Sequence, residues 1–394
     1  MVTDSQSGPA AGTRHVTVSE VRDLAAFQAL ERSWDACAAQ DPQSGFFSSH
    51  AWFSCCVDAF GADKQLRVFV LSDGDRVIAI APMWQQTEVR RGLRVRTLSF
   101  IDTPETQQAD FIVGSDDREG VIRTFLELLL PPGAAGCDLL ELTRWPETSG
   151  NVACVRRELL RRDIKHVEST SALMPFISTS GSWEAFLQSK SPKFRKTHRN
   201  IINRVERLEG VRLLRLSQPS DVPHFHKLLE VSVRSWKHQE GISMSARDET
   251  RCFFERVTTA AAQKNAWLGW ILEAGGRPIA MEYDLVSDGI VYAVRSDFDG
   301  AYDAYSPGAY LEHQVIKAVF ELGYREYNAG PGIAAYKLRW TDQTRRNVAF
   351  TIYNRTLKAK ALGGLETMIV PAARRMAGLT KTSWLRRRSP VVVP

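Results

Sequence analysis

The sequence predicts a mixed α/β fold, with mixed sheets of the α+β type, built as two similar halves. Short apolar runs of strand character alternate with amphipathic helical patterns along most of the chain. The order of these elements in the first half recurs in the second half, which favours an internal duplication. A chain of 394 residues is also longer than one typical core fills, so two domains are expected.

The first domain is expected over residues 16–175. It opens with a β-like run and a helix whose apolar residues recur at helical spacing. Residues 66–86 predict a hairpin, because the sequence Ser-Asp-Gly-Asp at 72–75 supplies a turn between two apolar strands. The other predicted elements of this half are helices over 46–60, 121–130 and 152–162 and strands over 93–101, 109–114 and 137–145.

The second domain is expected over residues 176–355. Residues 265–298 predict three antiparallel strands, because two glycine-containing turns divide one long apolar stretch. A strongly basic helix is predicted over 195–209, where Gly210 ends it. The remaining predicted elements are helices from about residue 182, over 221–239, over 246–264 and over 304–323, and strands over 211–216 and 325–328.

Composition limits the classes of protein that fit. With 44% hydrophobic and 24% charged residues the chain resembles an ordinary soluble protein, and no apolar run approaches the ~18 residues that span a bilayer. The polar segment 1–15 lacks the apolar region of a secretory signal and is expected to be a disordered lead-in. The six cysteines form no C-x-x-C pair and no group with histidines at metal-ligand spacing. We therefore expect reduced thiols, a cytoplasmic location and no metal.

Positive charge gathers at two places. The segment 356–394 contains eight basic residues and one acid, and we expect a basic amphipathic helical tail that either contacts an anionic membrane surface or packs on the body. Residues 190–207 contain seven basic residues and one acid. Because a solvated helix face normally mixes both signs, this helix predicts a site for an acceptor phosphate, a nucleotide-sugar diphosphate or an RNA backbone. Its candidate substrate-binding residues are Lys193, Arg195, Arg199 and Asn200.

The predicted helix 304–323 has an unusual beginning, Tyr-Ser-Pro-Gly. Ser306 suits the N-cap and Pro307 the first helical position, where its missing N–H costs nothing. Gly308 is unfavourable inside a first turn by about 1 kcal/mol relative to alanine, but it would let a ligand approach the backbone. One interpretation is a well-capped helix and nothing more. The other is an anion site, because free amides and the helix dipole attract a phosphate.

Several motifs together resemble a known family. Y-S-P-G-x-x-L before an amphipathic helix, then G-x-R-x-Y-N-x-G-x-G and Y-K-x-x-W, is similar to the C-terminal domain of a GNAT-superfamily group found in cellulose and exopolysaccharide gene clusters and related to the Fem peptidoglycan aminoacyltransferases. FFSSHAWF and the basic S-x-K-x-R-K-x-x-R-N helix also fit, so that the resemblance covers residues 16–345. It implies two tandem GNAT-like domains, with the working site mainly in the second. We expect no donor binding in the first, which has no equivalent of Ser306-Pro307-Gly308.

The resemblance also implies roles for particular residues. The turn that binds the pyrophosphate of acyl-CoA in the superfamily corresponds here to Tyr305, Ser306, Pro307, Gly308 and Ala309, although only one glycine is present. In the Fem-like pattern the aromatic–lysine pair lies at the substrate, which makes Lys337 a candidate to stabilise an oxyanion or a phosphate and Tyr336 a candidate acid for the leaving group. The alternative for Lys337 is a surface lysine on a strand.

Two further sets of residues are candidates from their positions. Glu282 and Asp284 alternate along one predicted strand, so both lie on one face, and either is a candidate general base if that face lines a cleft. If the face meets solvent instead, they are ordinary hairpin charges. Trp236 lies where acceptor contacts would fall, with a core tryptophan as the alternative.

The expected function is that of an N-acyltransferase that moves an acyl group directly from acyl-CoA to the amine of a small-molecule or sugar-linked acceptor. No Ser-His-Asp or Cys-His arrangement is evident in the sequence, which argues against a covalent acyl-enzyme. One alternative is a Fem-like aminoacyltransferase that uses aminoacyl-tRNA. An alternative of another class is a non-catalytic scaffold in polysaccharide biosynthesis, which predicts no transfer and no effect of changing Lys337.

Overall fold

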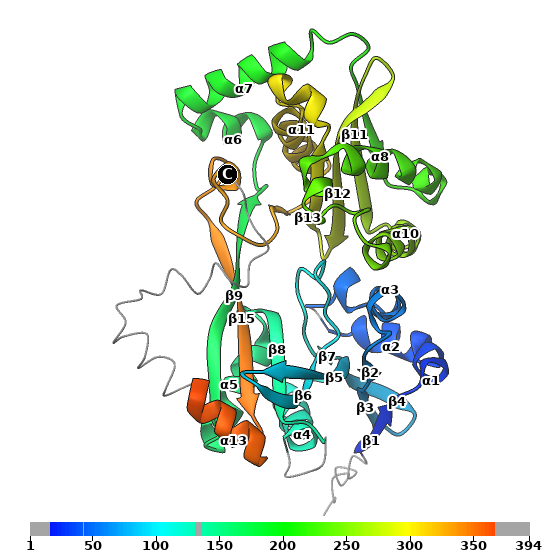
Figure 1. The fold of residues 1–394 in the computed structure, drawn as a ribbon, viewed down its shortest axis with the longest axis vertical. Helices are drawn as coiled ribbons and strands as arrows, with labels where there is room; N and C mark the ends of the chain where they lie inside the picture. Colours follow the sequence, from blue (N-terminus) through cyan, green and yellow to red (C-terminus); the bar gives the residue numbers. More distant parts are fainter. Residues whose placement is uncertain (1–15, 42, 131–135, 367–394) are drawn as a thin grey trace, which may run out of the picture.

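The computed structural model describes residues 16–41, 43–130 and 136–366 (Figure 1). The described chain forms one sheet of four strands and one of eleven, with helices on their faces. The lead-in 1–15 and most of the tail, 367–394, lie outside the described residues, and so does the prediction that the tail contacts a membrane. None of the described helices is both long and apolar enough to cross a bilayer.

The smaller sheet belongs to the first half, and its strands lie in the order β1-β3-β4-β7. The predicted hairpin is present, since β3 and β4 pair antiparallel around Gly74, whose φ of 58° the turn requires. The strands of this sheet are β1 (Val16–Val21), β3 (Val68–Asp73), β4 (Arg76–Ala81) and β7 (Ile112–Val113). The helices around it are α1 (Leu24–Ala29), α2 (Glu31–Ala38) and α3 (His50–Phe60), which a 3-10 turn at Phe46–Ser48 precedes.

The larger sheet runs through both halves in the order β10-β11-β12-β13-β14-β9-β15-β8-β6-β5-β2. Its second-half strands are β10 (Arg212–Leu216), β11 (Trp267–Ala274), β12 (Arg277–Ser287), β13 (Ile290–Phe298) and β14 (Glu326–Asn328). The first half contributes β2 (Gln65–Leu66), β5 (Met83–Arg90), β6 (Leu93–Phe100) and β8 (Leu139–Pro146). The three antiparallel strands predicted over 265–298 are therefore present as β11, β12 and β13.

Two long strands, β9 (His166–Ser178) and β15 (Thr344–Tyr353), join the halves. The end of β9, from Phe176, pairs with β14 of the second half, while its earlier residues pair with β15. β15 in turn pairs with β8 of the first half. One sheet thus continues through the expected boundary at residue 175, as the crossing strands in Figure 1 show.

The recurring order of elements is visible in the connections. In each half one helix joins two parallel strands: α4 (Arg118–Leu129) joins β6 to β8, and α11 (Pro307–Glu321) joins β13 to β14. Such a crossover needs a helix because parallel strands cannot be joined by a tight turn. The first half also contains α5 (Gly150–Arg161). The helix α13 (Leu357–Gly364) follows β15 near the end of the described chain.

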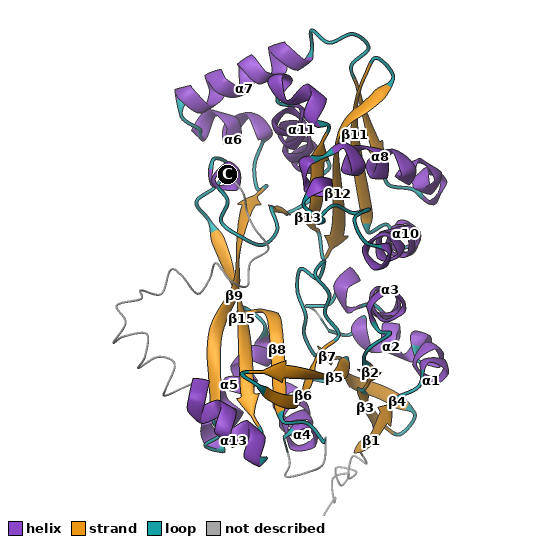
Figure 2. Ribbon diagram, in the orientation of Figure 1, coloured by secondary structure: helices purple, strands orange, loops and turns teal. Residues whose placement is uncertain are grey.

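Helices cover both faces of the second-half strands (Figure 2). One face packs under α11 together with α6 (Trp183–Ser189) and α7 (Pro192–Val205) in a core that contains Leu311, Val315 and Trp340. Leu322, which follows the last residue of α11, is 42% exposed. The other face packs under α8 (His226–Arg234), α10 (Asp248–Gln263) and the 3-10 helix Pro219–Phe225.

The core under α10 crosses between the halves. Trp52 of α3 meets Phe253 of α10 with ring centroids 5.4 Å apart, and Arg256 forms an ion pair with Asp58 at 2.6 Å. Trp52 and Phe253 belong to one continuous cluster of buried side chains that reaches from Phe27 to Tyr292. At the other end of the molecule, the described part of the tail packs on the body, since Ala359 and Leu362 of α13 are buried. The halves are therefore joined by a sheet and by a core.

Candidate functional site

The parallel strands β13 and β14 separate at one end. They pair only over Ile290–Tyr292 and Glu326–Asn328, while β13 continues to Phe298. After β14 the chain turns away through Gly330, whose φ of 76° favours glycine. A β-carbon at Gly330 would lie only 2.7 Å from the carbonyl oxygen of Ala293, so a side chain has no room there. Gly330 thus lies close to the backbone of β13, just beyond the last paired residues, Tyr292 and Asn328. The unpaired end of the β13–β14 pair is called the strand gap.

Two side chains from distant parts of the chain converge on this gap. The point that a β-carbon would occupy at Gly330 lies 3.8 Å from Nζ of Lys337 and 3.6 Å from Oε1 of Gln107. Lys337 comes from the short helix α12 (Ala335–Leu338), and Gln107 comes from a loop of the first half. Reasoning from the sequence found the first residue and missed the second.

Lys337 is buried rather than exposed on a strand, so the surface alternative is wrong. Its side chain is 7% exposed, and Nζ donates hydrogen bonds to the carbonyl oxygens of Gly330 at 3.2 Å and Pro331 at 2.9 Å. Burial lowers the pKa of Lys337 to about 8, against the opposing effect of the Glu312 carboxyl. The ammonium is thus retained at neutral pH but is close to losing its proton. The neighbouring Tyr336 is 46% exposed, and local desolvation raises the pKa of its hydroxyl.

Glu282 and Asp284 lie beneath α11 and not in solvent, so the interpretation as hairpin charges is wrong. They share one face of β12 as predicted, at 2% and 0% exposure. Glu282 Oε1 accepts a hydrogen bond from the Tyr327 hydroxyl at 2.7 Å, and Asp284 Oδ2 accepts one from Trp270 Nε1 at 3.0 Å. Burial raises the pKa of Glu282 to about 7 and holds that of Asp284 well above its ordinary value. Glu282 can therefore gain or lose a proton near neutral pH.

The beginning of α11 differs from the prediction in one respect. Ser306 is at the N-cap, but it has left-handed backbone angles (φ 57°, ψ 52°) and its side chain makes no capping hydrogen bond. The preceding residues Gly300–Tyr305 form a 3-10 helix. Gly308 has a packing reason, since a β-carbon there would lie 3.1 Å from the Phe298 ring. Within the described chain no acceptor contacts the amides of Gly308 and Ala309, which leaves them available.

The basic helix α7 packs on α11 and is anchored to the same corner. Arg204 donates to the carbonyl oxygen of Ala304 at 2.8 Å, just before the beginning of α11. Lys193, Arg199 and Asn200 are exposed, as an anion-binding face requires. Arg195 is instead occupied with the carbonyl oxygens of Gln188 and Lys190, at 2.6 and 2.8 Å. Trp236, on the short helix α9 (Trp236–Gln239), is 37% exposed, so the core alternative is wrong.

A family model matches this part of the chain. Residues 192–338 match the family model described as the acetyltransferase (GNAT) domain. These residues are a GNAT acetyltransferase domain. They run from α7 to α12 and so include the strand gap, Lys337, the buried acids and the beginning of α11. The expected resemblance to GNAT proteins is confirmed, and the chain is an acyltransferase; the link to cellulose gene clusters stays a prediction.

Solved structures share the fold over most of the chain. FemX matches with a TM-score of 0.58 at 10% identity, covering 84% of this chain and 98% of that one. The C-terminal domain of a putative lysylphosphatidylglycerol synthetase from Agrobacterium fabrum matches with 0.51 at 13% identity, over 85% and 95%. A protein of unknown function from Bacteroides thetaiotaomicron matches with 0.52 at 13% identity, over 86% and 100%. At these identities the likeness concerns the fold alone, and no curated protein matches the chain.

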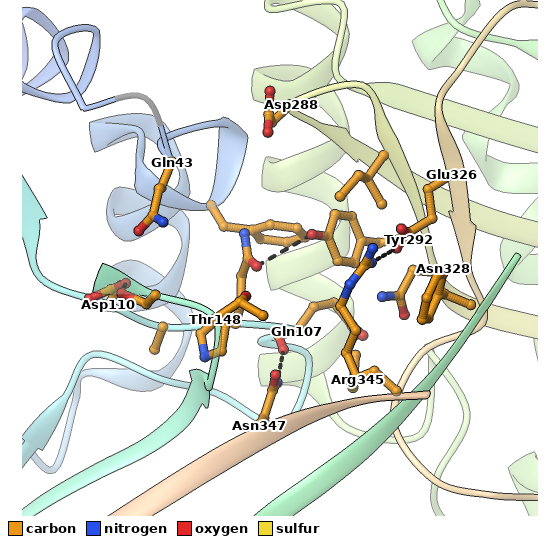
Figure 3. A pocket seen from close by; sticks show the side chains of 18 of the residues that line it. Gln43, Gln107, Asp110, Thr148, Asp288, Tyr292, Glu326, Asn328, Arg345 and Asn347 are labelled. Carbon is orange, nitrogen blue, oxygen red and sulfur yellow. Dashed lines mark hydrogen bonds and ion pairs between the residues drawn. The ribbon is translucent and has the colours of Figure 1, made fainter. Parts of the chain in front are cut away.

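A cavity of about 550 Å³ lies between the first half and the GNAT domain (Figure 3). The GNAT domain contributes Tyr292 and Asn328, which stand at the beginning of the strand gap, and β15 contributes Arg345 beside them. None of the residues predicted from the sequence lines this cavity. The first half contributes Gln43, Phe47, Gln107, Gln108, Asp110, Thr148 and Ser149.

The cavity wall is polar, but its charges are mostly neutralised. Arg345 is paired with Glu326, and its guanidinium lies 3.9 Å from the centroid of the Phe176 ring. Asp110 accepts hydrogen bonds from Ser149 Oγ at 2.6 Å and Asn151 Nδ2 at 2.7 Å, and burial raises its pKa to about 6. Amides and hydroxyls make up most of the remaining polar wall. Such a lining suits a ligand rich in hydrogen-bonding groups and without a large net charge.

The periodicity of the sequence does not predict the residues that the first half contributes to this cavity. The loop 102–110 is polar and shows neither helical nor strand alternation. Yet Thr103, Glu105, Thr106 and Gln107 are all less than 5% exposed. Their partners come from distant parts of the chain, such as Arg144, Arg295 and Asn347. A long polar loop without glycine or proline punctuation after residue 104 is the one signal in the sequence, and it becomes informative only when its burial is known.

Proposed function

We propose that the chain transfers an acyl group from acyl-CoA directly to the amine of a small-molecule or sugar-linked acceptor. The observation that carries this proposal is the burial of Lys337 at the open end of the β13–β14 pair, inside a GNAT domain. A buried ammonium beside a gap in the sheet is suited to stabilise charge that develops on a reacting carbonyl. The GNAT domain argues against the scaffold alternative, because a non-catalytic scaffold has no need of a buried ammonium such as Lys337.

The donor would bind with its phosphates at the beginning of α11. The free amides of Gly308 and Ala309, with the helix dipole behind them, favour an anion at this corner. Tyr305, Ser306 and Pro307 would shape the turn. The acyl end of the donor would extend along the gap toward Gly330, where the reacting carbonyl would meet Lys337.

The transfer itself would need three protein groups. The acceptor amine attacks the thioester carbonyl, the C–N bond forms, and the C–S bond breaks. Lys337 stabilises the oxyanion. The amine's proton passes to Glu282 by way of the Tyr327 hydroxyl, and Tyr336 protonates the departing thiolate. Asp284, on the same buried face of β12, is the alternative base. In this scheme the first half binds no donor, and the proposed location is the cytoplasm.

One observation favours a second candidate, an aminoacyl-tRNA donor. The exposed basic residues of α7 lie on the helix that packs against α11, so an RNA backbone could reach the proposed donor corner. FemX and the lysylphosphatidylglycerol synthetase domain share the fold. Incubating the protein with labelled acetyl-CoA or with charged tRNA separates the two donors. Dependence of transfer on low salt would favour RNA, because phosphate contacts weaken steeply as the salt concentration rises.

A kinetic experiment tests the role of Lys337. We expect Lys337→Ala to lower kcat by about 100-fold or more, because one oxyanion-stabilising group contributes roughly that factor. The measurement is transfer of the labelled acetyl group from acetyl-CoA to a panel of primary amines. Lys317→Ala is the matched control, since Lys317 is an exposed lysine of α11 in a surface ion pair with Glu321. Equal rates for the two variants would contradict the proposal.

A further inference from the structure

The loop that carries Gln107 is held against two strands, β15 and β13 of the GNAT domain. The Gln107 carbonyl oxygen accepts a hydrogen bond from Asn347 Nδ2 at 3.0 Å, which Figure 3 shows as a dashed line. Two residues earlier, Glu105 forms an ion pair with Arg295 of β13, with Nε 2.9 Å from the carboxylate. Both Glu105 and Gln107 are less than 5% exposed. The side chain of Gln107 is therefore presented in one fixed position.

The side-chain oxygen of Gln107 has no partner. Its Nε2 donates to the carbonyl oxygen of Glu105 at 3.2 Å, and this bond fixes which end of the amide carries the oxygen, because the reverse orientation would set two oxygens against each other. Oε1 is buried and receives no hydrogen bond from any described residue. A buried acceptor without a donor destabilises a fold, so a missing ligand is a better explanation than chance.

The position of this oxygen indicates what the ligand must supply. Gln107 lines the cavity between the halves, and Oε1 lies close to the same point above Gly330 as Nζ of Lys337. A hydrogen-bond acceptor beside the group that would polarise the donor carbonyl is placed to receive an N–H group. The amine of the acceptor is the N–H group that acyl transfer requires at this place.

We propose that Gln107 Oε1 accepts a hydrogen bond from the nucleophilic amine of the acceptor, so that the first half supplies a positioning residue to the GNAT domain. This inference rests on the proposed acyl transfer for the identity of the ligand. The hydrogen bond directs the nitrogen lone pair toward the carbonyl held at Lys337. The amide and hydroxyl wall around Gln107 indicates that the amine belongs to a hydroxyl-rich molecule, an amino sugar, rather than to an apolar alkylamine.

The test uses the full chain and D-glucosamine as the probe. Gln107→Met removes the unpartnered oxygen while nearly preserving volume and shape. We expect binding of glucosamine, measured by titration calorimetry, to weaken about ten-fold, which is the loss of one well-placed hydrogen bond. The thermal unfolding temperature should stay equal or rise, because an unsatisfied buried acceptor has been removed. A purely structural glutamine predicts the opposite, a lower unfolding temperature with unchanged binding.

The controls separate this inference from the proposed function. Gln86→Met changes a half-buried glutamine of β5 outside the cavity and should leave binding as in the wild type. Glucosamine binding that is unaffected by Gln107→Met, or absent from the wild type, would overturn the inference, even if acetyl transfer to another amine were found. Binding that depends on Gln107 without transfer from acetyl-CoA or tRNA would instead retain the site and remove the proposed function.

Discussion

At the scale of single residues, burial decides the chemistry of the site. Lys337 and Glu282 have ordinary pKa values far apart, yet removal from water brings them to about 8 and about 7. A base and a cation close to neutrality are the two groups that amine acylation uses. The same burial leaves the side-chain oxygen of Gln107 without a partner. These polar side chains cost stability, and function is the physical reason to keep them.

The pH dependence of the reaction follows from these two shifts. Because Glu282 must lose its proton to act as a base, kcat/KM should rise as the pH increases through about 7. Because Lys337 must keep its proton, kcat/KM should fall as the pH increases through about 8. Steady-state kinetics between pH 5 and pH 10 checks this narrow bell.

Two variants assign the limbs of this profile. Glu282→Gln should remove the acidic limb and slow transfer about 100-fold or more. Lys337→Arg should move the alkaline limb to higher pH, because a guanidinium keeps its charge. An acidic limb that persists in Glu282→Gln would show that another group is the base.

At the scale of elements, the helices α7 and α11 are joined by an unusual contact. His198 and His313 stack with ring centroids 5.4 Å apart, and Trp340 lies against both rings. Burial lowers the pKa of each histidine to about 4, so both are neutral at pH 7. In each ring Nδ1 lacks a partner among the described residues. The contact that anchors the basic helix to the proposed donor helix is therefore sensitive to acid.

Acid should weaken this contact between α7 and α11. A folded-state pKa below the ordinary value of 6.5 means that each histidine contributes stability above pH 6.5 and loses it as the pH falls toward 4. We expect the free energy of unfolding to fall by about 2 kcal/mol per histidine between pH 7 and pH 5. His198→Phe should reduce this loss, and the exposed His224→Ala should not. The measurement is the free energy of unfolding in urea at pH 7 and pH 5 for the wild type and both variants. Equal losses of stability in all three proteins would contradict the explanation.

At the scale of the whole molecule, the two halves are not separable units. β9 and β15 serve both parts of the larger sheet, and one buried cluster continues from α3 into α10. The cavity and the gap lie where the halves meet, and each half contributes residues to its wall. An arrangement of this kind makes the first half part of the site even though it has no proposed donor corner.

The shared strands predict cooperative unfolding. The full chain should unfold in one calorimetric transition, because neither half keeps a complete sheet without the other. The isolated segment 192–338 should fail to fold, since it lacks Ile177, Trp183 and Trp340 of the core under α11 and leaves one edge of β14 without β9. Calorimetry of the full chain and circular dichroism of the fragment check both statements. Two separate transitions, or a folded fragment, would show that the halves are independent.

Local pattern and composition predicted the recurring order of elements, the hairpins, the helix that begins at Pro307, the common face of Glu282 and Asp284, and the likeness to GNAT proteins. These follow from side-chain periodicity and turn chemistry, which act between near neighbours in the chain. The tertiary structure alone decided the strand order, the burial of Lys337 and the approach of Gln107 to it. Those features arise from contacts between segments that lie apart in the chain, such as β8 with β15 and Asn347 with Gln107. Desolvation, which sets the pKa values, depends on everything packed around a side chain.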